Sequence, residues 1–171
     1  MSSQRVSTRA NILVVDDIAA NLRLLSQMLT EHGYGVRAAT SGARALASVQ
    51  AALPDLVLLD IRMPGMDGYA VCEQLKAEEQ TRDIPVIFIS ALGETEDKVR
   101  AFEVGGVDYV TKPFQVEEVL ARVRTHLALR RLQKQLQDAN KKMEQELILA
   151  GEVQARFLPS APPRIPGWNF S

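Results

Sequence analysis

The sequence predicts an α/β fold: a five-stranded, doubly wound parallel sheet between helices, followed by a long C-terminal helical extension. Three observations predict it: short, wholly apolar runs recur along the chain, segments of helical period separate them, and no Gly or Pro occurs between Phe114 and Ala150. Apolar runs without alternation are typical of strands buried on both faces by helices. Five strand–helix repeats with right-handed crossovers then give the doubly wound arrangement.

The expected strands are the apolar runs at 12–15, 56–59 and 86–89 and, as weaker runs that each contain one charged residue, 36–39 and 107–110. Apolar residues at helical spacing mark the five helices: Leu22, Leu25 and Leu29; Leu46 and Val49; Val71 and Leu75; Val99 and Phe102; and Val116, Leu120, Val123 and Leu127. Gly33 is the expected end of the first helix, and Ser41 the expected N-cap of the second. Residues 1–10 are polar and are expected to form a flexible tail, so the domain spans 11–127.

Composition narrows the classes of function. The 171 residues suffice for one domain and an additional segment, and the net charge of −1 argues against direct nucleic-acid binding driven by bulk charge. A single cysteine, Cys72, excludes an internal disulfide and a Cys-based zinc site and is expected in the core, whereas His126 is expected on a solvated helix face. No apolar run is long enough for a membrane helix, and no signal peptide is recognisable, so a cytoplasmic location is expected.

Polar residues follow four of the expected strands where ligands bind in an open parallel sheet, outside the carboxyl ends. Asp16 and Asp17 follow the first strand, Asp60 the third, Ser90 the fourth and Lys112 the fifth. Converging carboxylates repel each other unless a hard cation, Mg²⁺ or alternatively Mn²⁺, binds them. Lys112 and Ser90 then suit the oxygens of a phosphoryl group, and a carboxylate beside it suits the role of nucleophile, giving an aspartyl phosphate.

The segment 11–127 resembles the receiver domain of two-component response regulators. The motifs that carry the resemblance are ILVVDD at 12–17, LVLLDIRMPGMDG at 56–68, PVIFISA at 85–91 and GGVDYVTKPF at 105–114. The resemblance implies a flavodoxin-like sheet in the order 2-1-3-4-5. It also implies a partner that donates phosphate, either a sensor histidine kinase or a phosphotransfer protein.

The resemblance further implies roles for the acidic residues. Asp60 is the implied phosphoacceptor. Asp17, Asp60 and the backbone carbonyl of Arg62 are the implied direct Mg²⁺ ligands, and Asp16 acts mainly through water. An aspartate-based hydrolase is a competing interpretation, but such enzymes usually carry a second aspartate two residues after the nucleophile, where this chain has Arg62.

Three further positions have implied roles in the response to phosphorylation. Ser90 is expected to bond the phosphoryl group, Tyr109 to swing inward behind it, and Lys112 to pair with it. The peptide bond between Lys112 and Pro113 is often cis in such domains, which the small trans preference of X-Pro bonds permits.

A heptad pattern follows the domain and predicts a helical coiled-coil linker over 128–158. The expected seam of a parallel homodimer contains Leu129, Leu132, Leu136, Met143 and Val153. Ala139, Ala150 and Glu146 also fall at seam positions and weaken it. The competing interpretation is a plain solvated helix with accidental spacing.

The last residues, 159–171, are expected to begin a truncated output domain. The stretch ILAGEVQARFLPSAPPRIPGW at 148–168 resembles the lead-in to PPM-type serine/threonine phosphatase domains of bacterial stress and sporulation regulators. The resemblance implies a phosphatase output acting on an anti-sigma-factor antagonist, while the residues present catalyse only their own phosphorylation and dephosphorylation. The alternatives are a diguanylate cyclase output and a stand-alone receiver that acts through protein interactions.

Overall fold

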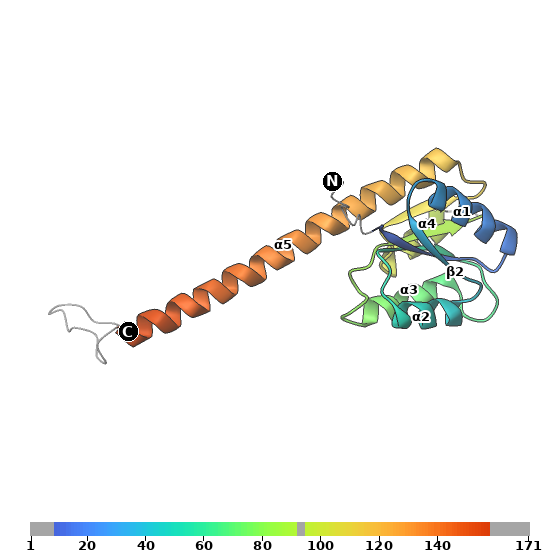
Figure 1. The fold of residues 1–171 in the computed structure, drawn as a ribbon. Helices are drawn as coiled ribbons and strands as arrows, with labels where there is room; N and C mark the ends of the chain where they lie inside the picture. Colours follow the sequence, from blue (N-terminus) through green and yellow to red (C-terminus); the bar gives the residue numbers. More distant parts are fainter. Residues whose placement is uncertain (1–8, 92–94, 158–171) are drawn as a thin grey trace, which may run out of the picture. The chain divides into compact units, whose positions relative to one another are not determined.

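The computed structural model of the chain describes residues 9–91 and 95–157, with side chains described as far as Glu152. Its centre is a five-stranded parallel sheet in the order β2-β1-β3-β4-β5 (Figure 1). The strands are β1 (Asn11–Val15), β2 (Gly35–Ala39), β3 (Leu56–Asp60), β4 (Val86–Ser90) and β5 (Asp108–Thr111). The predicted fold class and strand order are confirmed.

A helix follows each strand. The helices are α1 (Ala19–Glu31), α2 (Gly42–Ala51), α3 (Gly68–Ala77), α4 (Thr95–Glu103) and α5 (Val116–Phe157). Ser41 caps α2 as predicted, because its hydroxyl accepts the Arg44 N–H at 3.2 Å. Asp67 caps α3 in the same way and accepts the Ala70 N–H at 2.9 Å.

Helices cover both faces of the sheet. One face packs against α2, α3 and α4 through Leu13, Phe88 and neighbouring residues, and the other packs against α1 and α5 through Ile12, Ile87 and their neighbours. Figure 1 shows α2 and α3 together on one side of the sheet. Successive side chains of a strand point to opposite faces, so both sets are buried. This explains why the strands read as apolar runs without alternation, and Cys72 is buried in the core as predicted.

The chain divides into two compact units, Met1–Arg131 and Leu132–Ser171. The boundary falls within the continuous helix α5, four residues beyond the end of the predicted domain. Val153 lies in α5, but its side chain is outside the described residues, as are residues 158–171 of the predicted output segment. In the ranges that the structure describes, no helix combines the length and apolar character needed to cross a membrane.

The prediction of a solvated His126 is wrong. Its side chain is only 14% exposed, and its Nε2 lies 2.9 Å from Oδ2 of Asp108. Arg122 also contacts this carboxylate, donating to its two oxygens at 2.8 and 3.0 Å. Burial alone would raise the pKa of Asp108, but hydrogen bonds from His126, the Tyr109 N–H and Arg122 lower it below its ordinary value. The cluster ties β5 to α5.

Replacing Gly68 with alanine should destabilise the fold. A Cβ atom at this position would collide with the carbonyl oxygen of Asp60 and lie 2.9 Å from Cα of Ile61, and such backbone atoms cannot move aside as a flexible side chain can. We expect the free energy of unfolding to fall by about 1–3 kcal/mol, as for other overpacked sites, in urea titrations. Gly151→Ala is the control: apart from the neighbouring backbone of its own helix, no described atom lies within 4 Å of its Cβ, so no loss is expected. Equal stability of Gly68→Ala and the parent chain would contradict the close packing.

Candidate functional site

Three carboxylates meet at the carboxyl end of the sheet. Asp16 and Asp17 directly follow β1, and Asp60 is the last residue of β3. These strands are neighbours with Val15 paired to Leu59, so one carboxylate oxygen from each aspartate lies within 4.8 Å of the others. Asp16 and Asp60 are buried, with 1% and 6% exposure, whereas Asp17 is exposed. An all-oxygen donor set of this kind suits a hard divalent cation.

Lys112 brings a positive charge to this cluster. Its Nζ lies 3.0 Å from Oδ2 of Asp16 and 3.5 Å from Oδ2 of Asp60. The backbone of Lys112 is held at the adjacent strand end, because its N–H donates to the Ser90 carbonyl at 2.7 Å. One ammonium group therefore partly compensates two buried carboxylates.

The environment of Asp60 opposes its ionisation. Burial and then the negative charge of Asp16 raise its pKa, Lys112 lowers it, and Asp17 raises it further, so that the pKa is about 6 instead of 3.8. Lys112 thus leaves the repulsion within the cluster incompletely compensated. A bound divalent cation would stabilise the ionised form of Asp60.

Asp16 is oriented by groups of the chain that follows β1. Its Oδ1 accepts the Ile18 N–H at 2.8 Å, and its Oδ2 accepts Nδ2 of Asn21 at 3.1 Å. Sequence reasoning missed Asn21. The available signal was its place in the first turn of α1, five residues after Asp16, from which an amide reaches back to the strand end.

Comparisons with known proteins agree with this geometry. The family model described as "Response regulator receiver domain" matches residues 12–124. The chain belongs to the response regulator receiver family. The predicted resemblance to such a domain is therefore confirmed over residues 12–124, whereas the bounds 11–127 stay a prediction.

Two curated relatives show how far the similarity extends. The chain is 46% identical over 116 residues to the "DNA-binding dual master transcriptional regulator RpaA" of Synechocystis sp., covering 68% of this chain and 48% of that protein. It is 49% identical over 116 residues to "Response regulator PleD" of Caulobacter vibrioides, covering 68% of this chain and 26% of that protein. The chain therefore matches about half, or less, of the length of these relatives.

Solved structures of response regulators are also similar to this chain. A putative response regulator from Chloroflexus aurantiacus has a TM-score of 0.68 and 36% identity, covering 70% of this chain and 98% of that one. NtrX from Brucella abortus, determined in complex with ADP, has a TM-score of 0.71 and 32% identity, and the match covers 76% of this chain and 30% of that one. None of these similarities identifies the receiver's output.

The other predicted site residues of the receiver lie in β4 and β5 and at the peptide bond after β5. Ser90 is buried at the end of β4, next to Ile89, which pairs with Asp60. Tyr109 is also buried, and Nζ of Lys98 lies 5.7 Å from the centre of its ring. The peptide bond between Lys112 and Pro113 is cis. The signalling roles of Ser90 and Tyr109 stay predictions.

An open hollow of about 530 Å³ adjoins the loop after β3, and sequence reasoning did not find it. Arg62, Asp67 and Tyr69 line it from the loop and α3, and Asp97 and Arg100 from α4. The Tyr69 hydroxyl donates to the Asp97 carbonyl at 3.1 Å, and the Arg100 guanidinium lies 4.4 Å from the centre of the Tyr69 ring. These contacts link α3 to α4 near the loop. The side chain of Arg62 is exposed, and the role of its carbonyl as a metal ligand stays a prediction.

Removing the charge of Lys112 should raise the pKa of Asp60 further. Lys112 lowers this pKa both by its charge and by a hydrogen bond, so Lys112→Met should move the midpoint above about 6. The measurement is an NMR titration of the ¹³C-labelled side-chain carboxyl group without divalent cations. Lys134→Met, on an exposed part of α5, is the matched control and should leave the midpoint unchanged. An unchanged or lower midpoint in Lys112→Met would show that Lys112 does not act on Asp60.

Proposed function

We propose that this receiver accepts a phosphoryl group on Asp60 from a sensor histidine kinase or a phosphotransfer protein. The observation that carries the proposal is the meeting of three carboxylates within 4.8 Å with Lys112 at 3.0 and 3.5 Å from two of them. An oxygen of the ionised Asp60 forms the new bond to phosphorus, the phosphorus–nitrogen bond of the donor's phosphohistidine breaks, and the released imidazole takes up a proton. The product is an acyl phosphate on Asp60.

The donor set of the cluster fits Mg²⁺, with Mn²⁺ as the alternative. Asp17, Asp60 and the backbone carbonyl of Arg62 are the proposed direct ligands, and Asp16 is proposed to act mainly through water. When bound, the cation would reduce the repulsion between the carboxylates and the phosphoryl oxygens. Hydrogen bonds from Asn21 and the Ile18 N–H hold the Asp16 carboxylate in place for water-mediated binding of the cation.

Lys112 and Ser90 are proposed to bind the remaining oxygens of the phosphoryl group. Nζ of Lys112 lies 3.5 Å from Oδ2 of Asp60. Ser90 ends the neighbouring strand, one residue after Ile89, which pairs with Asp60. Both side chains therefore belong to strand ends next to the acceptor, where they suit the phosphoryl oxygens. Ser90 and Tyr109 are proposed as the switch residues that pass the modification to the surface. Phosphorylation shifts the receiver between two conformational states only if it stabilises one of them more than the other.

Small phosphodonors test the acceptor function directly. Incubation with acetyl phosphate or phosphoramidate and Mg²⁺ should add the mass of one phosphoryl group to the intact chain. The same incubation with excess EDTA should add little, because the metal is removed. A chain that stays unmodified in Mg²⁺ while a known receiver is labelled in parallel would contradict the proposal.

The output is proposed to be a PPM-type serine/threonine phosphatase acting on an anti-sigma-factor antagonist. The support is the similarity of residues 148–168 to the lead-in of such domains, with 159–171 as the start of the output. The names of RpaA and PleD describe proteins of which this chain matches half or less, so they do not decide the output. Reading the gene beyond the codon for Ser171 tests this: phosphatase motifs support it, whereas a diguanylate cyclase or a stop codon overturns it.

We also propose that the receiver works in the cytoplasm and pairs with a second copy through α5. Beyond the receiver core, this helix is exposed, including the large apolar residues Leu129, Leu132 and Leu136. A helix that exposes such residues gains stability by burying them against a partner. Light scattering of the whole chain should therefore report a dimer, and a chain that stays monomeric at tens of micromolar would exclude pairing.

A further inference from the structure

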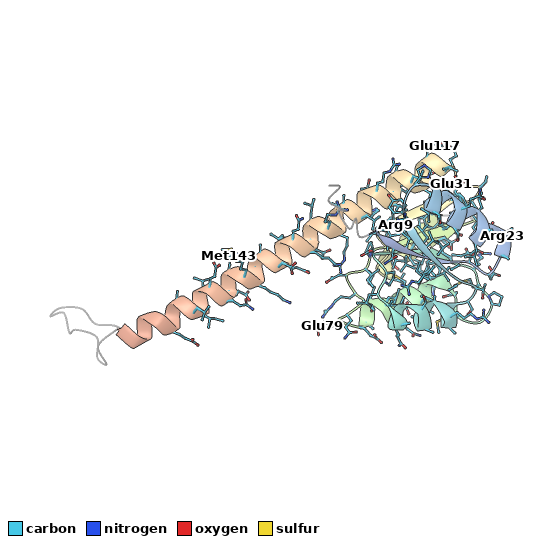
Figure 2. The ribbon with its side chains drawn as sticks, viewed as in Figure 1. Arg9, Arg23, Glu31, Glu79, Glu117 and Met143 are labelled. Atoms are coloured by element: carbon cyan, nitrogen blue, oxygen red, sulfur yellow. The ribbon has the colours of Figure 1, made fainter. Side chains whose placement is uncertain are left out.

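The exposed part of α5 carries more large apolar residues than the heptad pattern uses. Leu129, Leu132, Leu136, Met143, Leu147, Ile148 and Leu149 are all between 55% and 70% exposed. Figure 2 shows side chains standing out along this part of the helix, with Met143 labelled. Contiguous exposed apolar surface of this kind marks an interaction site.

Helical geometry shows which of these apolar residues lie on the same face of α5. Each residue of a straight α-helix turns by about 100°, so Leu129, Leu132, Leu136 and Met143 all lie within about 30° of one mean direction. Leu147 also lies about 30° from this direction. Glu146, which the heptad pattern places in the seam, is about 70° away, and the backbone position of Val153 is about 90° away.

The cause is the drift of a strict heptad. Seven residues fall about 20° short of two turns of a straight helix, and this shortfall accumulates with every heptad, whereas eleven residues pass three turns by about 20°. A heptad step from Leu129 to Leu136 followed by an eleven-residue step to Leu147 therefore completes about five whole turns. This chain has an eleven-residue repeat: Leu132 and Met143, Leu136 and Leu147, and Ala139 and Ala150 are each eleven positions apart. The repeat keeps its apolar residues on one straight stripe. It also removes the charged Glu146 from the centre of the contact.

We propose that this eleven-residue stripe, and not the heptad seam, is the surface through which α5 pairs in parallel with a second copy of the chain. The stripe consists of Leu129, Leu132, Leu136, Ala139, Met143, Leu147 and Ala150. The inference deepens the proposed dimerisation and rests on it. It assigns Leu147 to the interface and places Glu146 and Val153 at its edge.

Charge distribution favours a second copy in parallel orientation. Lys142 lies about 110° to one side of the stripe direction and Glu144 about 90° to the other side. In a parallel pair, each flank faces the opposite flank of the partner, so Lys142 of one copy approaches Glu144 of the other at nearly the same height. In an antiparallel pair, each flank faces itself and loses this complementarity. Around Leu136 the flanks carry uncharged Gln133 and Gln135, so no repulsion opposes pairing.

Disulfide trapping tests the register and the orientation. In a Cys72→Ala background, we expect Leu136→Cys and Leu147→Cys each to form intermolecular disulfides under mild oxidation. Glu146→Cys and Val153→Cys should cross-link several-fold more slowly. Faster cross-linking at 146 and 153 than at 147 would overturn the eleven-residue register. Cross-linking at only one of 136 and 147 would overturn the parallel, in-register arrangement, because both positions face their own copies only when the helices run in parallel.

A matched pair of polar substitutions tests the energetic role. Leu147→Gln should weaken dimerisation by about tenfold or more, since a buried leucine contact is lost in both copies. Ile148→Gln, similar in exposure but about 130° from the stripe, should change it less than about twofold. Sedimentation equilibrium measures both constants, and circular dichroism checks that the helix persists. Equal weakening by the two variants would refute the stripe.

The outcomes separate this inference from the functions proposed above. A parent chain that is monomeric excludes the dimer altogether, whereas a dimer insensitive to Leu147→Gln excludes only the register. Neither outcome depends on phosphorylation of Asp60, which mass spectrometry measures on the same samples.

Discussion

Asp60→Asn should abolish labelling of the receiver by acetyl phosphate in the presence of Mg²⁺. The amide of asparagine has nearly the size of the carboxyl group but lacks its negative charge and is a poor nucleophile, so no acyl phosphate forms. The acidic cluster offers two other carboxylates, but Asp16 is occupied by Lys112, Asn21 and the Ile18 N–H. The expected result is an unmodified intact mass under conditions that label the parent chain.

The control is Asp138→Asn, which removes an aspartate from an exposed part of α5. It should be labelled at the same rate as the parent chain. A second variant, Asp17→Asn, keeps the acceptor but removes a proposed metal ligand, so labelling should slow and require more Mg²⁺. If Asp60→Asn instead gains one phosphoryl group as readily as the parent chain, Asp60 is not the acceptor.

The acidic site could be predicted because its residues lie within two positions of the end of an expected strand. Asp16, Asp17, Asp60 and Lys112 stand at strand ends that a parallel sheet brings to one edge. Periodicity does not define which strands are neighbours, however. The order that places β1 beside β3 came from the resemblance to receivers, and the structure confirms it.

Contacts between distant elements were not predictable in the same way. His126 lies on a helix whose local pattern is polar, yet Asp108 from β5 draws its ring into a partly buried cluster with Arg122. The hydrogen bond from Asn21 to Asp16 depends on how α1 follows β1. Such contacts depend on the packing of whole elements, which a single stretch of sequence does not encode. The predicted seam of α5 left Leu147 out because it follows a seven-residue period, whereas a straight helix turns once per 3.6 residues.

Asp60→Asn should also make the metal-free receiver more stable at neutral pH. The folded state raises the pKa of Asp60 from 3.8 to about 6, so the folded protein binds this proton more tightly than the unfolded chain does. The favourable contribution of protonated Asp60 is complete below the ordinary pKa and is lost as the pH rises through about 6. At pH 7.5 the ionised group costs up to about 3 kcal/mol, and asparagine does not ionise.

Chemical denaturation in EDTA measures this difference. The free energy of unfolding of Asp60→Asn should exceed that of the parent chain at pH 7.5, and the excess should shrink towards pH 4. Asp138→Asn should show no such change, since its carboxylate is exposed. A variant that is less stable than the parent at pH 7.5, or a difference that does not depend on pH, would contradict the repulsion in the cluster.

Adding Mg²⁺ should reverse the order of stability. A cation at about 100 times its dissociation constant stabilises the folded parent chain by about 2.7 kcal/mol. Asp60→Asn lacks one anionic ligand and should gain much less. Because Mg²⁺ binds the ionised carboxylate, protons compete with it below pH 6, and the apparent affinity should fall by about tenfold between pH 7.5 and pH 5. Thermal unfolding over a Mg²⁺ series at the two pH values tests this, and equal affinities would mean that Asp60 is not among the groups that bind the metal.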